Sequence, residues 1–494
     1  MAYKRMPMQF GEWTPDRATR SSPTNEAKGV IAQQGDYVPF KSAARLNGTS
    51  AASAAQCRGV WGCYDITNAP HAFMGDATKL YNIESSVAVD RSIGGGYAAS
   101  ADRFWSFEQF GQYVVACFKD VNPQVFDLTT FPVVAFANLG GSPPQADVCG
   151  RVREFLFLAA DATLTWSGFN DITTWTPSGT TQAGTITLET NGGPIKKIIG
   201  GETGTVFQER QINRFTYVGP PTIWDRAIVE ERRGCISQNA AVKVGRIIYY
   251  VSEEGFFSFD GYQSTPIGMN RVDEYFLRRL NFGYRHYVHM AYDAVQRMVI
   301  CAFPAGSSIL PSEVMIYSIS DDRWTHDDLD CEVFGEIPLL GYNLDTLDTY
   351  PGANGMDLAS LGPVPIDSPI FTVSRMQPAI ADASHALSVF SGVNRPAIIE
   401  TQEAELEPGR RGMVTEIWPL ADAPYDAMSV AITSRAQTPG DSVASSNVVT
   451  CNATGFAGVR TDARFLRAQL NIAAGAVWTH AEGLHAKMKV TSAR

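Results

Sequence analysis

The chain has 494 residues, of which 45% are hydrophobic and only 18% are charged. That charged fraction lies below the roughly 25% of a typical soluble domain, and 43 glycines, 27 prolines and 11% aromatic residues accompany it. The composition excludes coiled coils, helical bundles and disordered chains, and it favours short strands joined by tight turns. The formal net charge is −11 and no basic run exceeds two residues, which excludes a protein that grips nucleic acid through phosphate contacts.

Targeting signals and disulfides are not expected. No stretch approaches the ~18–20 apolar residues of a membrane span, and the first residues lack the apolar run of a secretory signal. We therefore expect a soluble chain that is made in a cytosol. The eight cysteines include no Cys-x-x-Cys pair, and some, such as Cys117 and Cys301, lie within apolar runs. These patterns predict free, buried thiols.

Residues 1–50 are polar and carry no periodic apolar pattern. Prolines at positions 7, 15, 23 and 39 exclude a long helix, because proline removes a backbone donor and clashes with the preceding turn. The segment predicts an extended arm that packs either on the body of its own fold or on a neighbouring subunit.

Residues 51–395 contain a loosely repeated β-hairpin, in which an apolar run, a polar turn and a second aromatic run follow one another. Its copies occupy residues 71–83, 111–127, 153–166, 204–217, 245–261 and 297–324. Recurrence every ~40–50 residues is typical of β-propeller blades. A β-sandwich is the alternative, since any antiparallel domain contains hairpins. We favour the propeller because the copies share an order of residue types as well as a strand period. The order is Gly, a basic or polar residue, an apolar run, a turn, an aromatic residue and Asp.

Four further segments complete the predicted all-β fold. The apolar positions of residues 272–280 predict one helix. Residues 304–313 and 340–369 are read as inserted loops, and a loop as long as the second is usually functional or part of an interface. Residues 396–494 alternate between apolar and polar positions, which predicts a C-terminal antiparallel, sandwich-like domain packed at the end of the propeller.

Motifs that carry chemistry are missing from the sequence. It contains no Gly-x-Ser-x-Gly, Gly-x-Gly-x-x-Gly or His-Glu-x-x-His motif and no phosphate-binding loop. His286 and His289 would point to opposite faces of a strand, so we do not expect them to share a metal. The order of Gly168 and Asp171 is reversed relative to a sialidase Asp-box. We predict no catalytic, cofactor-binding or metal-binding residue, no cofactor and no enzymatic activity.

An acidic cluster is the one candidate for an ion. Carboxylates could supply the six to eight oxygens that Ca²⁺ takes, although their spacing does not match the calcium-binding loop. A solvated turn of a blade is the favoured interpretation, and ion binding stays open. The cluster consists of Asp321, Asp322, Asp327, Asp328 and Asp330.

The order of motifs from Trp166 to Phe276 resembles that of the tail nozzle proteins of short-tailed bacteriophages, which are also called tail tubular or packaged-DNA stabilisation proteins. The similar runs include 204–219 and 245–261, and residues 475–483 are also similar. The resemblance rests on the order of the motifs and does not extend to the first 100 residues or to the 304–369 region.

The resemblance implies a structural virion protein of the phage tail, assembled in the cytoplasm of a bacterial host. It implies a β-propeller subunit that forms a homohexameric ring below the tail adaptor ring and beside tail fibre, spike or needle proteins. Such a ring retains packaged double-stranded DNA and passes it during ejection, without sequence-specific binding. The net negative charge fits a channel wall that repels DNA.

Two other functions remain as alternatives. One is a propeller lectin or glycoside hydrolase that acts on host-surface glycan, which would carry an aromatic and carboxylate pocket on one face of the propeller. The other is a tail spike or hub protein, although these are usually rich in short β-helix repeats, and no such repeat is visible here.

Overall fold

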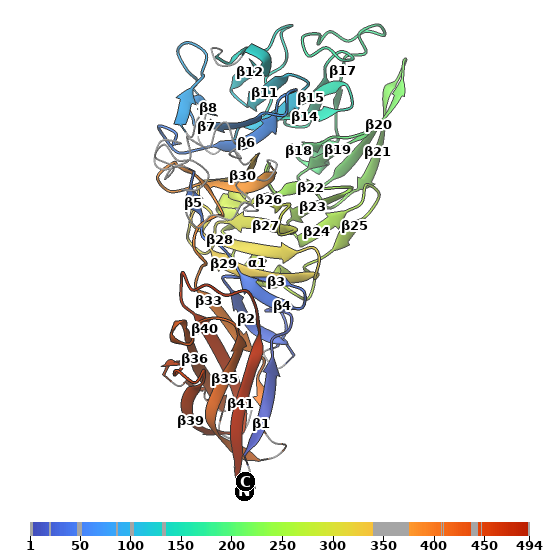
Figure 1. The fold of residues 1–494 in the computed structure, drawn as a ribbon. Helices are drawn as coiled ribbons and strands as arrows, with labels where there is room; N and C mark the ends of the chain where they lie inside the picture. Colours follow the sequence, from blue (N-terminus) through green and yellow to red (C-terminus); the bar gives the residue numbers. More distant parts are fainter. Residues whose placement is uncertain are drawn as a thin grey trace, which may run out of the picture.

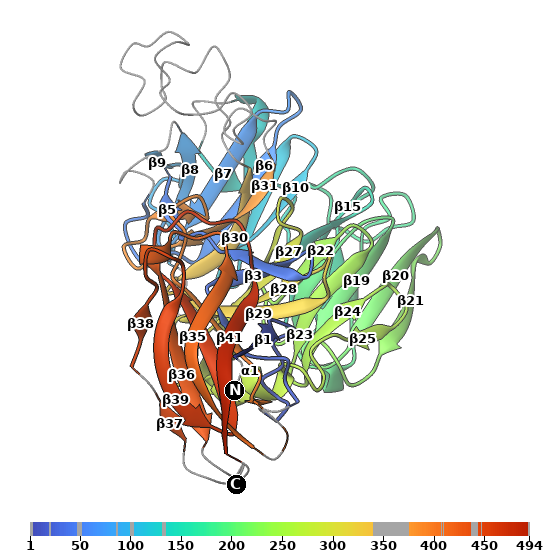
Figure 2. The same ribbon diagram turned by 60° about the horizontal axis from the view of Figure 1, so that its bottom comes forward.

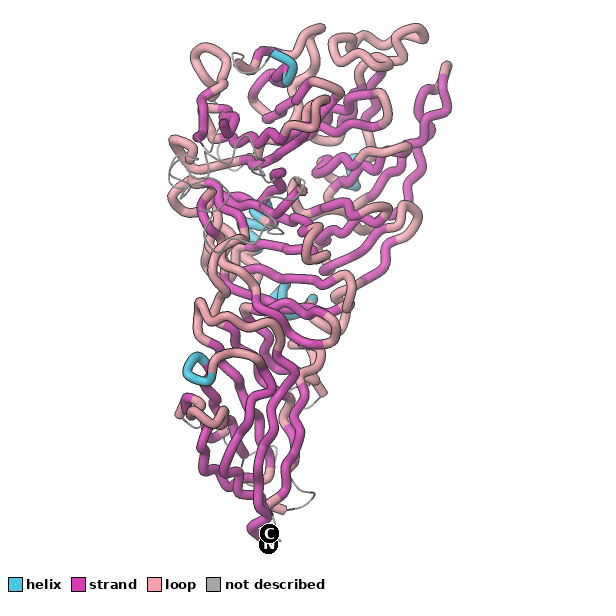
Figure 3. The backbone as a smooth tube through the Cα atoms, viewed as in Figure 1, coloured by secondary structure: helices cyan, strands magenta, loops and turns pink. Residues whose placement is uncertain are grey.

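The computed structural model is an elongated, almost entirely β molecule, with a wide body at one end and a narrow tip at the other (Figures 1 and 3). Among the residues that it describes, no helix is long and apolar enough to cross a membrane. The structure describes residues 3–18, 21–46, 52–84, 87–98, 103–130, 135–338, 375–406, 408, 410–435, 443–445 and 447–492.

The body is a β-propeller, and the described residues form seven four-stranded antiparallel blades in it. Blades one and two consist of β6 (Gly59–Tyr64), β7 (Pro70–Gly75), β8 (Leu80–Glu84) and β9 (Val87–Asp90), and of β10 (Ser106–Phe110), β11 (Tyr113–Phe118), β12 (Val121–Asp127) and β13 (Ala137–Asn138). Blades three and four consist of β14 (Val148–Val152), β15 (Phe155–Ala160), β16 (Thr163–Trp166) and β17 (Gly184–Thr187), and of β18 (Ile195–Ile199), β19 (Thr203–Gln208), β20 (Ile212–Gly219) and β21 (Ile223–Glu230).

The ring continues through three more blades and closes on blade one. Blades five and six consist of β22 (Ala241–Val244), β23 (Ile247–Ser252), β24 (Gly255–Phe259) and β25 (Ser264–Pro266), and of β26 (His289–Asp293), β27 (Met298–Phe303), β28 (Glu313–Ser318) and β29 (Arg323–Asp328). Blade seven consists of β30 (Val333–Pro338), β31 (Met376–Ala381), β32 (Leu387–Val389) and β5 (Ala44–Arg45). β30 packs against β6, and β5 completes the last blade by pairing Ala44 with Val389.

The blades hold together through apolar layers between their faces. β27 and β28 are buried at every position, because neighbouring blades cover both faces of a middle strand. Between blades one and two, Phe73 packs against Phe107 and Phe126 at ring-centroid distances of 6.5 and 5.5 Å. The predicted hairpins coincide with strands of six blades, which confirms the propeller.

The narrow end is a second domain, which we call the tip domain, built from both ends of the chain (Figure 2). Its N-terminal strands are β1 (Lys4–Gln9), β2 (Thr24–Lys28), β3 (Val30–Gln33) and β4 (Asp36–Pro39). Its other strands are β33 (Ala397–Thr401), β34 (Ala404–Glu405), β35 (Arg411–Ala421), β36 (Met428–Arg435), β37 (Ala444–Ser445), β38 (Val449–Thr450), β39 (Ala457–Ala463), β40 (Phe465–Ile472) and β41 (Ala481–Ser492).

The strands of the tip domain form two sheets. One has the order β3-β4-β41-β35-β39, with β1 beside β41, and the other runs β2-β33-β40-β36-β37, with β34 beside β40 and β38 beside β36. The second sheet is continuous with the propeller, because β2 pairs in parallel with β29 of blade six, with Lys28 opposite His326. A single eleven-stranded sheet therefore spans both domains.

The structure refines several expectations from the sequence. The described part of residues 1–50 (3–18 and 21–46) is extended, but it is divided between the tip domain and blade seven, so it packs on its own fold. The predicted helix is confirmed as α1 (Asp273–Arg279), and all eight cysteines are buried and free. The 340–369 loop lies outside the described residues, and β28 begins at the end of the 304–313 segment. The short 3₁₀ helices are η1 (Leu128–Thr130), η2 (Thr190–Gly192), η3 (Phe282–Tyr287) and η7 (Tyr425–Ala427).

Gly29 marks the point where the chain passes from one sheet of the tip domain to the other. Its φ is +70°, and a Cβ there would lie 2.1 Å from the carbonyl oxygen of Pro396. Gly35, in the β3–β4 turn, also has a positive φ (+91°) but has nothing within 4 Å of an added Cβ. We expect Gly35→Ala to cost about 1–2 kcal/mol through backbone strain alone. Gly29→Ala should lower the melting temperature further, and equal shifts for the two variants would contradict the close approach of Pro396.

Candidate functional site

The innermost strands of the propeller surround a channel that contains two overlapping cavities. A cavity of about 340 Å³ lies inside the channel, and a wider cavity of about 730 Å³ lies at one end of it. Both volumes fall in the range of roughly 300–1,000 Å³ that is usual for small-molecule pockets. The residues that line both cavities are Trp61, Glu108, Arg151, Gly200 and Met376, so the two form one continuous pocket.

The wider cavity, which we call the mouth, lies on the face where the inner strands end. Trp61, Glu108 and Arg151 lie on the inner strands β6, β10 and β14, and residues of the turns that follow β10, β14 and β18 complete the rim. Side chains of the rim therefore come from separate blades. The polar and aromatic residues of the rim are Trp61, Tyr64, Glu108, Gln109, Arg151, Arg153, Glu154 and Glu202.

The opposite end of the channel has a floor made of residues at or just before the starts of the inner strands. The side-chain amide of Gln238 donates to the carbonyl oxygens of Phe104 (3.3 Å) and Asp147 (3.2 Å). The ring of Phe104 packs edge-on against Tyr287 and His289, at centroid distances of 5.1 and 4.8 Å. These contacts tie together the loops before blades two, three, five and six.

Two half-buried carboxyl groups, of Glu108 and Glu336, and the ammonium group of Lys197 line the channel. Burial raises the pKa of Glu108 to about 7, although the backbone N–H of Arg151 and the nearby charge of Lys197 lower it. Burial also raises the pKa of Glu336, whose carboxylate accepts the backbone N–H of Tyr292 at 2.7 Å. Lys197 makes no ion pair with a described residue, so its charge acts on both carboxyls from a distance.

The histidines lie differently from the sequence-based expectation. His286 belongs to η3 and His289 begins β26, so they do not share a strand. Burial, followed by the charges of His286 and Lys197, lowers the pKa of His289 to about 3, which keeps its imidazole neutral. Among the described residues, no group of three or more His, Cys, Asp or Glu side chains could hold a metal ion.

The acidic cluster is dispersed over several contacts. Asp328 pairs with Lys28, Asp327 pairs with Arg395, and a carboxylate oxygen of Asp321 accepts the backbone N–H of Gly35. These contacts lie between the propeller and residues of the tip domain or the segment that precedes it. The cluster thus contributes to the junction of the two domains.

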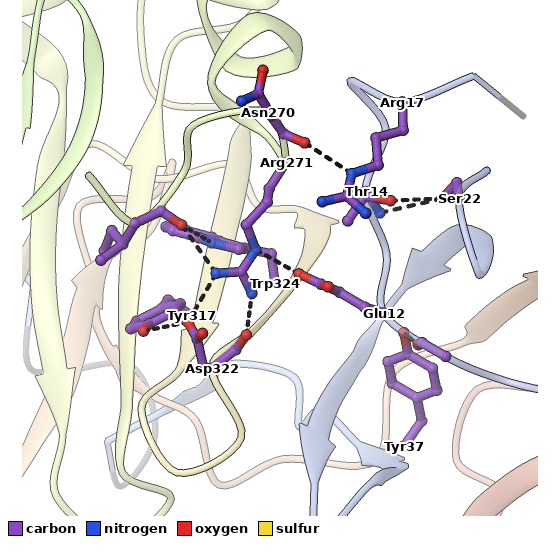
Figure 4. A network of polar contacts seen from close by, with 12 residues as sticks. Glu12, Thr14, Arg17, Ser22, Tyr37, Asn270, Arg271, Tyr317, Asp322 and Trp324 are labelled. Atoms are coloured by element: carbon purple, nitrogen blue, oxygen red, sulfur yellow. Dashed lines mark hydrogen bonds and ion pairs between the residues drawn. The ribbon is translucent and has the colours of Figure 1, made fainter. Parts of the chain in front are cut away.

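Arg271 is the centre of a polar network at this junction (Figure 4). Its guanidinium donates to the carboxylate of Glu12 from the N-terminal segment and to Asp322 of the β28–β29 turn, where the Nη1–Oδ1 distance is 2.8 Å. The hydroxyl of Tyr317 donates to the same oxygen of Asp322 at 2.8 Å. One side chain therefore connects blade six with residues that precede β2.

The same N-terminal segment covers helix α1. The carboxylate of Asp16 accepts the backbone N–H groups of Glu274 (2.9 Å) and Tyr275 (2.7 Å), so it satisfies donors that the first turn of a helix leaves free. Trp13 is 1% exposed and stacks on His326 of β29 at 4.5 Å, with the rings 21° apart. We call the buried Trp13 ring the Trp13 plug. It holds the N-terminal segment in place together with the charged contacts of Asp16 and Glu12.

Comparisons with known proteins identify no relative by sequence, since no protein-family model and no curated protein matches the chain. Among solved structures, it is similar to the extracellular domain of a hybrid two-component system of B. thetaiotaomicron (9% identity, TM-score 0.40, 82% of this chain and 47% of that one). It is also similar to YCF48 bound to D1 peptide (9%, 0.38, 73% and 97%) and to a chain of the mitotic checkpoint complex (8%, 0.40, 73% and 98%).

The chain spans about half the length of the first of these structures. Its own fold defines it as an all-β protein, with a propeller body and a sandwich-like tip domain. The sequence indicated none of the pocket residues, because they come from several blades and none belongs to a local motif.

Trp13 provides a test of the junction. Replacing a fully buried tryptophan by alanine typically costs about 3–5 kcal/mol, so Trp13→Ala should lower the melting temperature strongly. Tyr262→Ala is the control, because this ring is 72% exposed and should contribute about 1 kcal/mol or less. Differential scanning fluorimetry measures both. Similar melting temperatures for the two variants would mean that the plug does not stabilise the fold.

Glu108 makes stability depend on pH. Its pKa is about 7 in the folded state and near 4.3 in an unfolded chain, so between these values the folded state binds more protons. Stability therefore falls as the pH rises from about 4.5 through 7. Glu108→Gln should flatten this part of the curve and be the more stable protein at pH 8. Denaturant unfolding at several pH values checks this, and parallel curves for the two proteins would contradict it.

Proposed function

We propose that the chain is a structural subunit of the tail nozzle of a short-tailed bacteriophage, which continues the DNA channel, retains packaged DNA and passes it during ejection. The order of motifs between residues 166 and 276 suggests this family. The main structural support for the proposal is the eleven-stranded sheet that runs from blade six into the tip domain.

A subunit of a DNA conduit has to keep its shape while a stiff, charged polymer moves past it. A flexible linker between propeller and tip would let the two move independently, since ordinary interdomain contacts permit relative motion. Backbone pairing between β2 and β29, together with the Arg271 network and the Trp13 plug, supports a rigid connection. This construction suits a load-bearing wall.

The charge of the chain is consistent with the same role. Its net charge of −11 disfavours adhesion to DNA phosphates and so permits sliding. We expect the surface that faces the ring lumen to carry more carboxylates than Lys and Arg side chains. A lumen lined mainly by basic residues would count against this part of the proposal.

Ring formation is the direct test. We expect the purified chain, alone or added to tails that lack it, to form six-fold rings in negative-stain images, with a central opening wide enough for a DNA duplex. Added to nozzle-deficient particles, it should also reduce the loss of packaged DNA to nuclease. Heat-denatured protein serves as the control. A chain that stays monomeric, does not join tails and leaves DNA retention unchanged would refute the proposal.

A further inference from the structure

We propose that the pocket at the mouth of the propeller binds the end of a neutral saccharide. This binding function goes beyond the nozzle role and does not depend on ring formation. An aromatic and carboxylate pocket on one propeller face is the feature expected of a glycan-binding propeller. The mouth has this composition, with Trp61 and Tyr64 beside Glu108 and Glu154.

The charges of the pocket select the class of ligand. The charged side chains that line its two cavities are balanced in number, with Glu108, Glu154, Glu202 and Glu336 against Arg151, Arg153, Lys197 and Lys243. A phosphate-rich ligand would meet four carboxylates, and a cation would meet four basic groups. A purely apolar ligand would have to desolvate all of them. A neutral molecule rich in hydroxyl groups can donate to the carboxylates and accept from the basic groups.

Trp61 offers a platform for a sugar ring. Its indole is half-buried and stacks on Phe107, with the centroids 6.0 Å apart and the planes inclined by 10°. This contact fixes the orientation of the indole while Trp61 lines both parts of the pocket. A rigid aromatic ring supplies contact area at little entropic cost and favours ligands with one apolar face.

Two charged side chains are positioned to bind hydroxyl groups. The Nε of Arg151 donates to the carbonyl oxygen of Arg153 at 2.9 Å, which orients the guanidinium beside the mouth. Glu108 lies deeper, and a carboxyl that titrates near neutral pH can donate as an acid or accept as a carboxylate. Hydrogen bonds that involve ionised groups are roughly twice as strong as neutral ones, so a few of them suffice for binding.

The floor decides which part of a saccharide can enter. Gln238 and Phe104 link the loops at the other end of the channel, so we expect a saccharide to enter from the mouth and not to thread through the propeller. The ligand then places one terminal unit in the narrower cavity, while the next units lie across the rim. We therefore expect recognition of chain ends and not of internal segments.

An array of bacterial surface oligosaccharides, probed with the purified full-length chain, tests this inference. We expect binding to at least one neutral glycan, and at least a tenfold loss of affinity in Trp61→Ala and in Glu108→Gln. Trp418→Ala and Glu231→Gln are matched controls, because neither residue lines the pocket, and they should bind as the unaltered chain does. Capping the terminal unit of the glycan should abolish binding.

Several outcomes would overturn the proposal. One is the absence of binding above background for every neutral glycan, and another is binding that the pocket variants and the controls retain equally. Binding restricted to phosphorylated or carboxylated glycans would overturn the assignment of a neutral ligand. Trp61→Ala also removes the packing on Phe107. If this variant unfolds and Glu108→Gln does not, the binding measured for the isosteric Glu108→Gln variant decides the test. Ring formation is scored separately, so the two proposals can fail independently.

Discussion

The parallel pairing of β2 with β29 is the contact on which the arrangement of the two domains depends. The outer strand of a propeller blade ordinarily leaves a row of unpaired backbone groups, which is an aggregation hazard. Here β2 meets that edge at one register pair, Lys28 opposite His326, and β33, β40 and β36 continue the sheet. Once this register is fixed, Arg271, Asp16 and Trp13 reach their partners. The junction is therefore defined by backbone hydrogen bonds and refined by side chains.

The local pattern of apolar and polar residues predicted those elements whose partner strands or turns lie close in the sequence. The hairpins of six blades and helix α1 each show their periodicity within a few residues. Blade seven was missed, because β30 and β31 are separated by a long segment and its fourth strand, β5, comes from residues 44–45. The strands of residues 4–39 were also missed: β1 contains Pro7 and pairs Lys4 with Met488. Proline is tolerated in such an edge strand, and no local signal reveals a partner that far away.

The pocket could not be predicted for a related reason. Trp61, Glu108, Arg151, Lys197 and Glu336 lie in five different blades, and only the closed ring brings them together. Within its own hairpin, each is an ordinary residue of an inner strand. The aromatic and carboxylate composition could be named from the sequence as a feature to look for, but its position required the register of the blades. Sites of this kind depend on tertiary closure and leave no spaced motif.

The split composition of the tip domain imposes an order on folding. β1 to β4 leave the ribosome first, yet β1 and β4 pair with β41, and β2 pairs with β33 and β29. β3 and β4 can pair with each other at once, but β1 and β4 have to wait for β41 until the whole propeller has been synthesised. Contacts between residues so distant in sequence form slowly, because closing long loops costs entropy. The tip domain therefore depends on every strand up to β41: a chain that stops before β41 leaves β1 and β4 without this partner and would expose them to proteases.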